Sequence, residues 1–163
     1  MKTYYIFRHG ETFVTKKGGW YWHRLYSAPI LEQGKPVITK MAHYLKDIES
    51  DYNVRSPFLR CQQTAEIVTD ITGKIFEVDR RIREWDFEIP YYFKRRVLNF
   101  ITEMEKSDKQ VILVCTHALV LQVMIQYLTL GNVNMGKLLA APLPGVLTII
   151  KEKKAEQIDF NLK

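Results

Sequence analysis

The segment at residues 111–130, "VILVCTHALVLQVMIQYLTL", constrains the fold most, because twenty consecutive residues contain no Asp, Glu, Lys or Arg. Its length would just span a bilayer, but His117 and two glutamines would be costly in lipid. The first half is rich in β-branched residues and the second half is not. We therefore predict a buried strand, a turn at Thr116–His117 and a buried helix that ends at Gly131, with a membrane span as the alternative.

Strand-like and helix-like segments alternate along the rest of the chain, whereas residues 12–32 look irregular. This alternation predicts an α/β fold, a three-layer sandwich whose mostly parallel central sheet is flanked by helices. In the second predicted helix, Ser56 is expected to be the N-cap and Pro57 the first helical residue, with Gly73 ending it. Strands are predicted at residues 3–7, 52–54, 74–78, 111–115, 146–150 and 157–162, and helices at 33–48, 57–72, 90–106 and 118–130.

Length and charge narrow the range of partners. The 163 residues are expected to form one domain, residues 1–163, because this length suits a single core. A net charge of +6 favours anionic partners, but there is no long run of Lys and Arg. We therefore do not expect nucleic acid to be the partner, although a nucleic-acid-binding module is the alternative that the charge suggests. The two cysteines, Cys61 and Cys115, are expected to be buried free thiols, which favours the cytoplasm.

Charged and imidazole side chains follow the predicted strands. Arg8 and His9 come directly after the first strand, His117 follows the strand at 111–115, and Arg60 lies in the first turn of a helix. Ligands bind beyond the carboxyl ends of parallel strands, so these four residues are expected to converge. Arginine forks and helix N-termini suit a phosphate. No His, Cys, Asp or Glu pattern has metal-ligand spacing, so neither a metal nor a cofactor is expected.

A phosphate held between two histidines permits covalent chemistry. A neutral imidazole can attack phosphorus, and the remaining cationic groups can stabilise charge on the phosphoryl oxygens. A nearby carboxylic acid would then protonate the departing alkoxide.

Five segments, in order, resemble motifs of the histidine phosphatase superfamily, which includes the cofactor-dependent phosphoglycerate mutases. The likeness covers nearly the whole chain. The segments are "RHGET" (8–12), "PILEQGKPVITKMAHYL" (29–45), "SPFLRCQQTAEIV" (56–68), "RIREWDFE" (81–88) and "VILVCTHALVL" (111–121). The resemblance implies that His9 is the nucleophile that becomes phosphohistidine. It also implies that Arg8, Arg60 and His117 bind the phosphoryl group.

The sequence also departs from the family pattern. Thr15 stands where the family often has Asn, and it is expected to bind phosphate more weakly. Glu84 aligns with the family's proton donor, but the usual "GxWEG" continuation is missing, which leaves Glu88 as a rival acid. The short segment between the acid and His117 implies a small lid and an open site. The aromatic and basic stretch "GGWYWHRLY" (18–26) is either a substrate-binding flap or a packed surface loop.

Together these features predict a metal-independent phosphomonoester hydrolase that acts through a phosphohistidine on His9. Its expected partner is a small phosphorylated metabolite, with no membrane, no metal and no assigned oligomeric state. One alternative is a phosphoglycerate-type mutase, which would return the phosphoryl group to a sugar acid. The other is a catalytically decayed phosphate-binding protein, which would bind phosphate without turnover.

Overall fold

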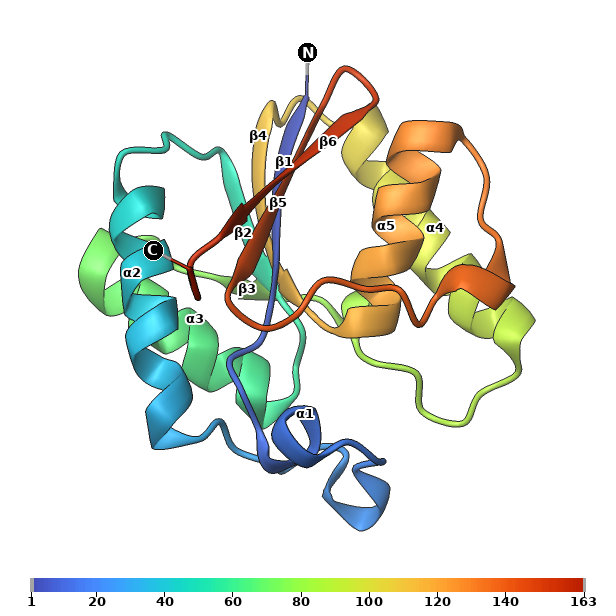
Figure 1. Cartoon of the computed structure of the whole chain (residues 1–163). Helices are drawn as coiled ribbons and strands as arrows, with labels where there is room; N and C mark the ends of the chain where they lie inside the picture. The colour runs from blue at the N-terminus through green and yellow to red at the C-terminus, as the bar shows by residue number, and fades with distance from the viewer. Residues whose placement is uncertain (1, 163) are drawn as a thin grey trace.

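A six-stranded sheet runs through the centre of the computed structural model, which describes residues 2–162 (Figure 1). Within these residues the sheet order is β3-β2-β4-β1-β5-β6. The strands are β1 (Thr3–Arg8), β2 (Tyr52–Arg55), β3 (Glu77–Val78), β4 (Val111–Thr116), β5 (Val146–Lys151) and β6 (Lys154–Asp159). The helices are α1 (Phe13–Lys17), α2 (Lys35–Lys46), α3 (Leu59–Thr72), α4 (Pro90–Lys106) and α5 (Ala118–Leu130).

The first four strands of this order form the parallel part of the sheet. β2 pairs in parallel with β3 and β4, and β4 pairs in parallel with β1. The last two strands are antiparallel: β5 pairs with β1, and β6 returns along β5 as a hairpin. The predicted α/β class with a mostly parallel sheet is therefore confirmed, as is the hairpin at the end of the chain, although β6 begins and ends three residues before the predicted strand at 157–162.

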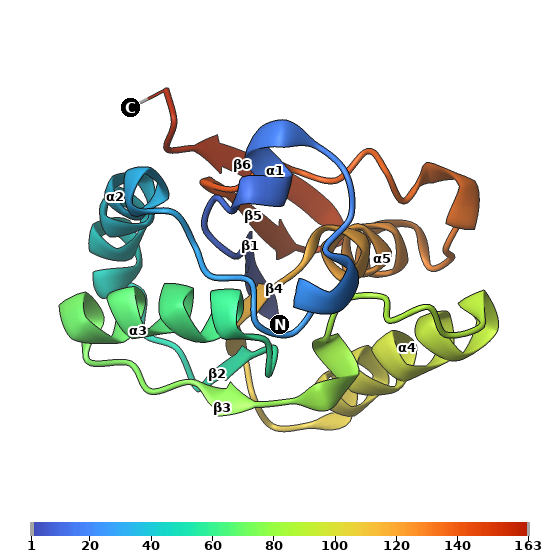
Figure 2. The same ribbon diagram turned by 90° about the horizontal axis from the view of Figure 1, so that it is seen from below.

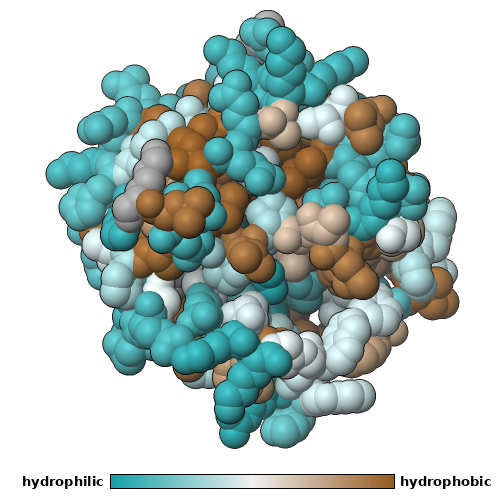
Figure 3. Space-filling model, in the orientation of Figure 1, coloured by the Kyte–Doolittle hydropathy of each residue, from teal (hydrophilic) through white to brown (hydrophobic). Residues whose placement is uncertain are grey.

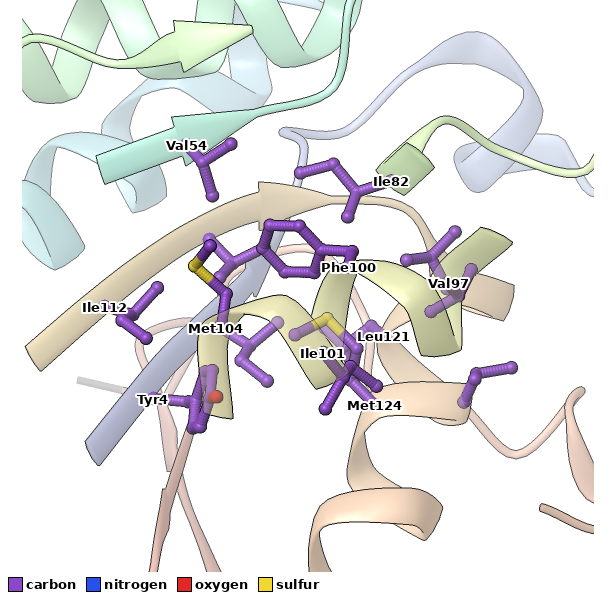
Figure 4. Close-up of a cluster of buried hydrophobic side chains, with 14 of the residues drawn as sticks. Tyr4, Val54, Ile82, Val97, Phe100, Ile101, Met104, Ile112, Leu121 and Met124 are labelled. Carbon is purple, nitrogen blue, oxygen red and sulfur yellow. The ribbon is translucent and has the colours of Figure 1, made fainter. Parts of the chain in front are cut away.

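Helices cover both faces of the sheet, because successive side chains of a strand point to opposite faces. Tyr4 and Ile6 of β1 pack into a core with α4 and α5, whereas Phe7 packs into a second core with α2 and α3. Figure 4 shows part of the first core, where Phe100 and Met104 of α4 meet the strands. The three layers seen in Figure 1 follow from these two cores.

The charge-free segment folds as predicted. It forms β4 and α5, with His117 between them as the N-cap residue of the helix. Gly131 ends α5 with φ 72°, a left-handed conformation that glycine adopts without a steric penalty. Among the residues described, no helix combines the length and the apolar character that crossing a membrane requires.

Several local predictions need correction. α3 begins at Leu59 with Phe58 as its N-cap residue, so Ser56 does not cap it. Residues 12–32 are not wholly irregular, because Thr12 caps the short helix α1 through a capping box. The predicted strand at 74–78 is reduced to the two residues of β3. α4, by contrast, has the predicted bounds.

Figure 2 looks at the edge where the parallel strands end. There α1 and the segment after it lie over the strands, between the two helical layers, and the segment before α4 lies nearby. On the face shown in Figure 3, hydrophilic residues occupy most of the outline and hydrophobic residues lie mainly nearer the middle. The carboxyl-end edge is where the sequence places its candidate site.

Candidate active site

Two histidines meet at this edge because their strands are neighbours in register. Arg8 at the end of β1 pairs with Thr116 at the end of β4. The residue that follows each strand is a histidine. The backbone N–H of His9 donates to the carbonyl of Thr116 at 3.0 Å. The ring centroids of His9 and His117 lie 5.2 Å apart, and both residues are buried. The predicted convergence of these two histidines is thus observed.

The hydrogen bonds of His9 fix which ring nitrogen is free. Its Nδ1 lies 2.8 Å from the carbonyl oxygen of Gly10. Because a carbonyl can only accept, Nδ1 carries the proton in the neutral ring, and Nε2 keeps its lone pair. The Gly10 N–H donates to Thr64 Oγ1 at 2.9 Å. A Cβ at Gly10 would approach Ile30 and Ile38 at 3.3 Å, so the close packing here favours glycine. The loop thus holds His9 as a potential nucleophile.

Ser56 fixes the second histidine instead of capping a helix. Its Oγ lies 2.6 Å from Nε2 of His117. The Phe58 ring lies 5.1 Å from the His117 ring between centroids. Sequence reasoning missed this role because the position of Ser56 before Pro57 is also typical of a helix start.

Two arginines, the buried Arg60 and the half-buried Arg8, lie beside the histidines with unused buried hydrogen-bond donors. Arg60 is fully buried, and its Nη1 donates to the carbonyl of Leu25 at 2.6 Å. Among the described residues, neither Nε nor Nη2 of Arg60 has a hydrogen-bond partner, and the same holds for Nε of Arg8. Buried donors without partners are expensive unless a ligand satisfies them. These guanidinium groups therefore form a site that an anion would complete.

Tyr21 is a site residue that the sequence did not single out. The guanidinium carbon of Arg60 lies 4.1 Å from the centroid of its ring. The Tyr21 hydroxyl lies 2.7 Å from Thr12 Oγ1, and its ring centroid is 6.4 Å from that of His9. The only signal was its place in the aromatic stretch 18–26, which joins the site through this contact.

The site keeps both histidines neutral. Burial lowers the pKa of His9 well below its ordinary value of 6.5, and the positive charges of Arg60 and Arg8 lower it further. The pKa of His117 is likewise lowered well below 6.5, first by burial and then by Arg60. A neutral His9 is the form that can attack phosphorus.

Glu84 lines a pocket beside Arg8. Its side chain accepts a hydrogen bond from the backbone N–H of Trp85 at 3.0 Å. Burial raises the pKa of Glu84, although that hydrogen bond and the charges of Arg60 and Arg8 act in the opposite direction. Glu84 and Arg8 line the same pocket of about 170 Å³. A carboxyl group with a raised pKa is suited to donate a proton there.

Glu88 has a different environment. Its Oε1 accepts from Nη2 of Arg96 at 2.6 Å and from Nε at 2.9 Å. Arg83 lies 3.5 Å from its other carboxylate oxygen. Arg96 also donates to the backbone carbonyl of Glu84 at 3.0 Å. Glu88 thus belongs to an ion-pair network that supports the segment carrying Glu84.

The hydroxyl of Thr15 takes part in the capping box of α1. It accepts from the backbone N–H of Thr12 at 2.7 Å and donates to the Thr12 carbonyl at 3.1 Å. Thr15 also lines a separate hollow with Glu11 and Asn161. Phosphate binding by Thr15 stays a prediction, and this arrangement does not favour it.

Comparison with known protein families identifies a match over the first half of the chain. A family model of the histidine phosphatase superfamily (branch 1) matches residues 4–91, which is more than half of the chain. A search of curated proteins found no match.

Several solved structures share the fold. An alpha-ribazole phosphatase from Shigella flexneri is 20% identical with a TM-score of 0.75, over 96% of this chain and 95% of that one. The protein histidine phosphatase SixA, complexed with tungstate, is 20% identical with a TM-score of 0.71, over 99% of each chain. A phosphoglycerate mutase from Bacillus anthracis is 18% identical with a TM-score of 0.68, over 97% and 92%. At these identities the likeness establishes a common fold.

Proposed function

Because the chain belongs to the histidine phosphatase superfamily, in which a phosphohistidine mechanism is typical, we propose that it hydrolyses phosphomonoesters through an intermediate on His9. The observation that carries the proposal is the set of buried, unpartnered donors of Arg8 and Arg60 beside His9, a histidine whose pKa is lowered well below 6.5. Release of phosphate from a panel of monoesters in excess chelator tests it. No release from any member of the panel would overturn it.

The proposed reaction has two steps. Arg8, Arg60 and His117 hold the phosphoryl group, and Nε2 of His9 attacks phosphorus while the bond to the ester oxygen breaks. Glu84 gives its proton to the departing alkoxide. Water then attacks the phosphohistidine, Glu84 takes back a proton, and phosphate leaves with His9 restored. Charge on the phosphoryl oxygens is stabilised by the arginines throughout.

A small phosphorylated metabolite is the proposed substrate, and the cytoplasm the proposed location. The buried free thiols of Cys61 and Cys115 support a reducing compartment. Hydrolysis is favoured over mutase chemistry because the short segment between Glu84 and His117 forms only a small lid, whereas a mutase must protect its phosphorylated intermediate from water.

Replacing Glu84 with glutamine should separate the proton donor from its rival. We expect kcat for an alkyl phosphate to fall by about 10²–10⁴-fold, the usual contribution of general acid catalysis. For p-nitrophenyl phosphate, whose leaving group needs no proton, kcat should fall far less. Glu88→Gln is the matched control. It should lower the melting temperature through its lost ion pair with Arg96, and any fall in kcat should be the same for the alkyl and the p-nitrophenyl ester. The reverse pattern would make Glu88 the acid.

The pH dependence of kcat/KM should reflect the two shifted groups. Because the pKa of His9 is lowered, activity should fall only when the pH drops well below 6.5 and the ring becomes protonated. Because the pKa of Glu84 is raised above its ordinary 4.5, activity should fall on the high-pH side of the optimum, as the pH rises through that raised pKa and this carboxyl loses its proton. Glu84→Gln should remove this high-pH fall in activity when an alkyl phosphate is the substrate. An acid limb centred above pH 6.5 would contradict this assignment.

A further inference from the structure

The pocket beside Arg8 and Glu84 is built from two aromatic segments. Trp20, Tyr21 and Trp22 come from the segment after α1, and Trp85 and Phe87 come from the segment before α4. All three tryptophans of the chain line this one pocket. Leaving-group atoms would lie here, because Glu84 must reach the ester oxygen.

Polar side chains are scarce in this pocket. Its remaining lining residues are glycine or aliphatic, namely Val14, Gly19, Leu25, Leu119 and Leu139. The Tyr21 hydroxyl already lies in hydrogen-bonding contact with Thr12. Among residues 2–162, no amide or free hydroxyl side chain lines the pocket to bind a sugar. Arg8 is the one cationic side chain that the described part of the chain contributes to this lining, and the proposed mechanism uses Arg8 on the phosphoryl group.

The two segments are held against each other with local backbone strain. Trp22 has φ 45° and Phe87 has φ 51°, both in the left-handed region that bulky residues rarely adopt. Their rings stack at 6.3 Å between centroids with 23° between planes. A hydrogen bond from the Tyr26 hydroxyl to Asp86 ties the same segments together. Strained residues of this kind persist where surrounding contacts fix them, and they concentrate at ligand clamps.

The rings are also unusually open to water. Trp20 is 53% exposed and Phe87 is 56% exposed, although they contact each other at 6.3 Å between centroids. Exposed aromatic rings grouped beside a reactive site mark a binding surface more often than a packing surface. A flat ring placed among them would remove this apolar area from water.

We propose that this pocket selects phosphomonoesters whose leaving group carries a planar aromatic ring, with Trp20, Trp22 and Phe87 as the residues that determine specificity. The inference rests on the proposed phosphatase function. It specifies the substrate class and makes residues 18–26 a substrate-binding flap.

Three substrates that each release a primary alkoxide test the proposal: 2-phenylethyl phosphate, 2-cyclohexylethyl phosphate and glycerol 1-phosphate. We expect kcat/KM for the phenyl ester to exceed that for the glycerol ester by about 10- to 100-fold, the value of stacking a ring on aromatic side chains. It should exceed the cyclohexyl ester by about 3- to 10-fold, because only the flat ring gains aromatic geometry. Equal values for phenyl and cyclohexyl esters, or a preference for glycerol 1-phosphate, would overturn the proposal.

Substitutions in the pocket test which side chains cause the preference for the phenyl ester. Trp20→Ala and Phe87→Ala should each bring the phenyl-to-cyclohexyl ratio towards one. Tyr91→Ala is the control, because this tyrosine is 62% exposed but does not line the pocket, and it should leave the ratio unchanged. A ratio that survives both pocket substitutions would overturn the assignment of these residues.

Failure of the phosphatase proposal can be told apart from failure of this one. If none of the three esters is hydrolysed, calorimetric titration with 2-phenylethylphosphonate and 2-cyclohexylethylphosphonate replaces kinetics. Tighter binding of the phenyl compound in the wild type, lost in Phe87→Ala, would support the aromatic pocket without turnover. Equal or absent binding would overturn it.

Discussion

Replacing His9 with alanine is expected to lower kcat for phosphomonoester hydrolysis by about 10⁴-fold or more, the scale seen when a covalent nucleophile is removed. The reason is geometric as well as chemical. Nδ1 of His9 is held by the Gly10 carbonyl, so the free Nε2 is the reacting atom. His117 has no equivalent free Nε2, because that atom lies 2.6 Å from Ser56 Oγ. Initial rates with p-nitrophenyl phosphate in excess chelator measure the effect.

The control for this variant is His43→Ala. His43 is an exposed histidine of α2 and lies outside the candidate site, so its kcat should match the wild type. Far-UV circular dichroism and thermal melting would show that both variants fold. A His9→Ala enzyme that folds and keeps kcat within about tenfold of the wild type would mean that another group attacks phosphorus.

Replacing Arg60 with methionine should cost activity without a matching cost in stability. We expect kcat/KM to fall by about 10²–10⁴-fold, because one or two charge-assisted hydrogen bonds to the phosphoryl group are lost at roughly 1.5–3 kcal/mol each. The free energy of unfolding without ligand should fall by no more than about 1 kcal/mol, because the hydrogen bond lost from Nη1 to the Leu25 carbonyl is offset by the removal of a buried cation whose Nε and Nη2 have no partner. Steady-state kinetics and urea unfolding measure the two effects.

Orthovanadate sharpens this test. It should raise the melting temperature of the wild type by binding the folded state, and Arg60→Met should lose most of that rise. Arg95→Met replaces an exposed arginine of α4 and should show the same vanadate-induced rise in melting temperature as the wild type. If Arg60→Met unfolds far more easily and yet keeps its vanadate response, Arg60 would be a structural residue and the anion site would lie elsewhere.

Features set by short-range pattern could be predicted from the sequence. The amphipathic spacing that begins at Pro90 predicted α4 with its observed bounds, and the uncharged run predicted β4, the turn at His117 and α5. The pairing of His9 with His117 was predictable because parallel strands place their carboxyl ends at one edge. Once the two strands were predicted, the positions of the histidines that directly follow them did not depend on any long-range side-chain contact.

Features set by side-chain partners far along the chain could not be predicted. Ser56 has the local signature of an N-cap, but its hydroxyl lies against His117, which is 61 residues away. Tyr21 enters the site only because its ring covers Arg60. The sequence aligns Glu84 with the family's proton donor but leaves Glu88 as a rival, and the ion pair of Glu88 with Arg96 that sets the two carboxylates apart is visible only in the structure. The hydroxyl of Thr15 is similarly taken up by its local helix cap.

The most direct test of the central claim is to trap the phosphorylated enzyme. The wild type would be mixed with excess substrate, quenched in alkali within a single turnover, and digested for mass spectrometry. We predict one phosphoryl group on the peptide that contains His9, stable in alkali and lost in acid, and absent from His9→Ala. Phosphate release with no such species during turnover, or a phosphoryl group on another residue, would contradict the account.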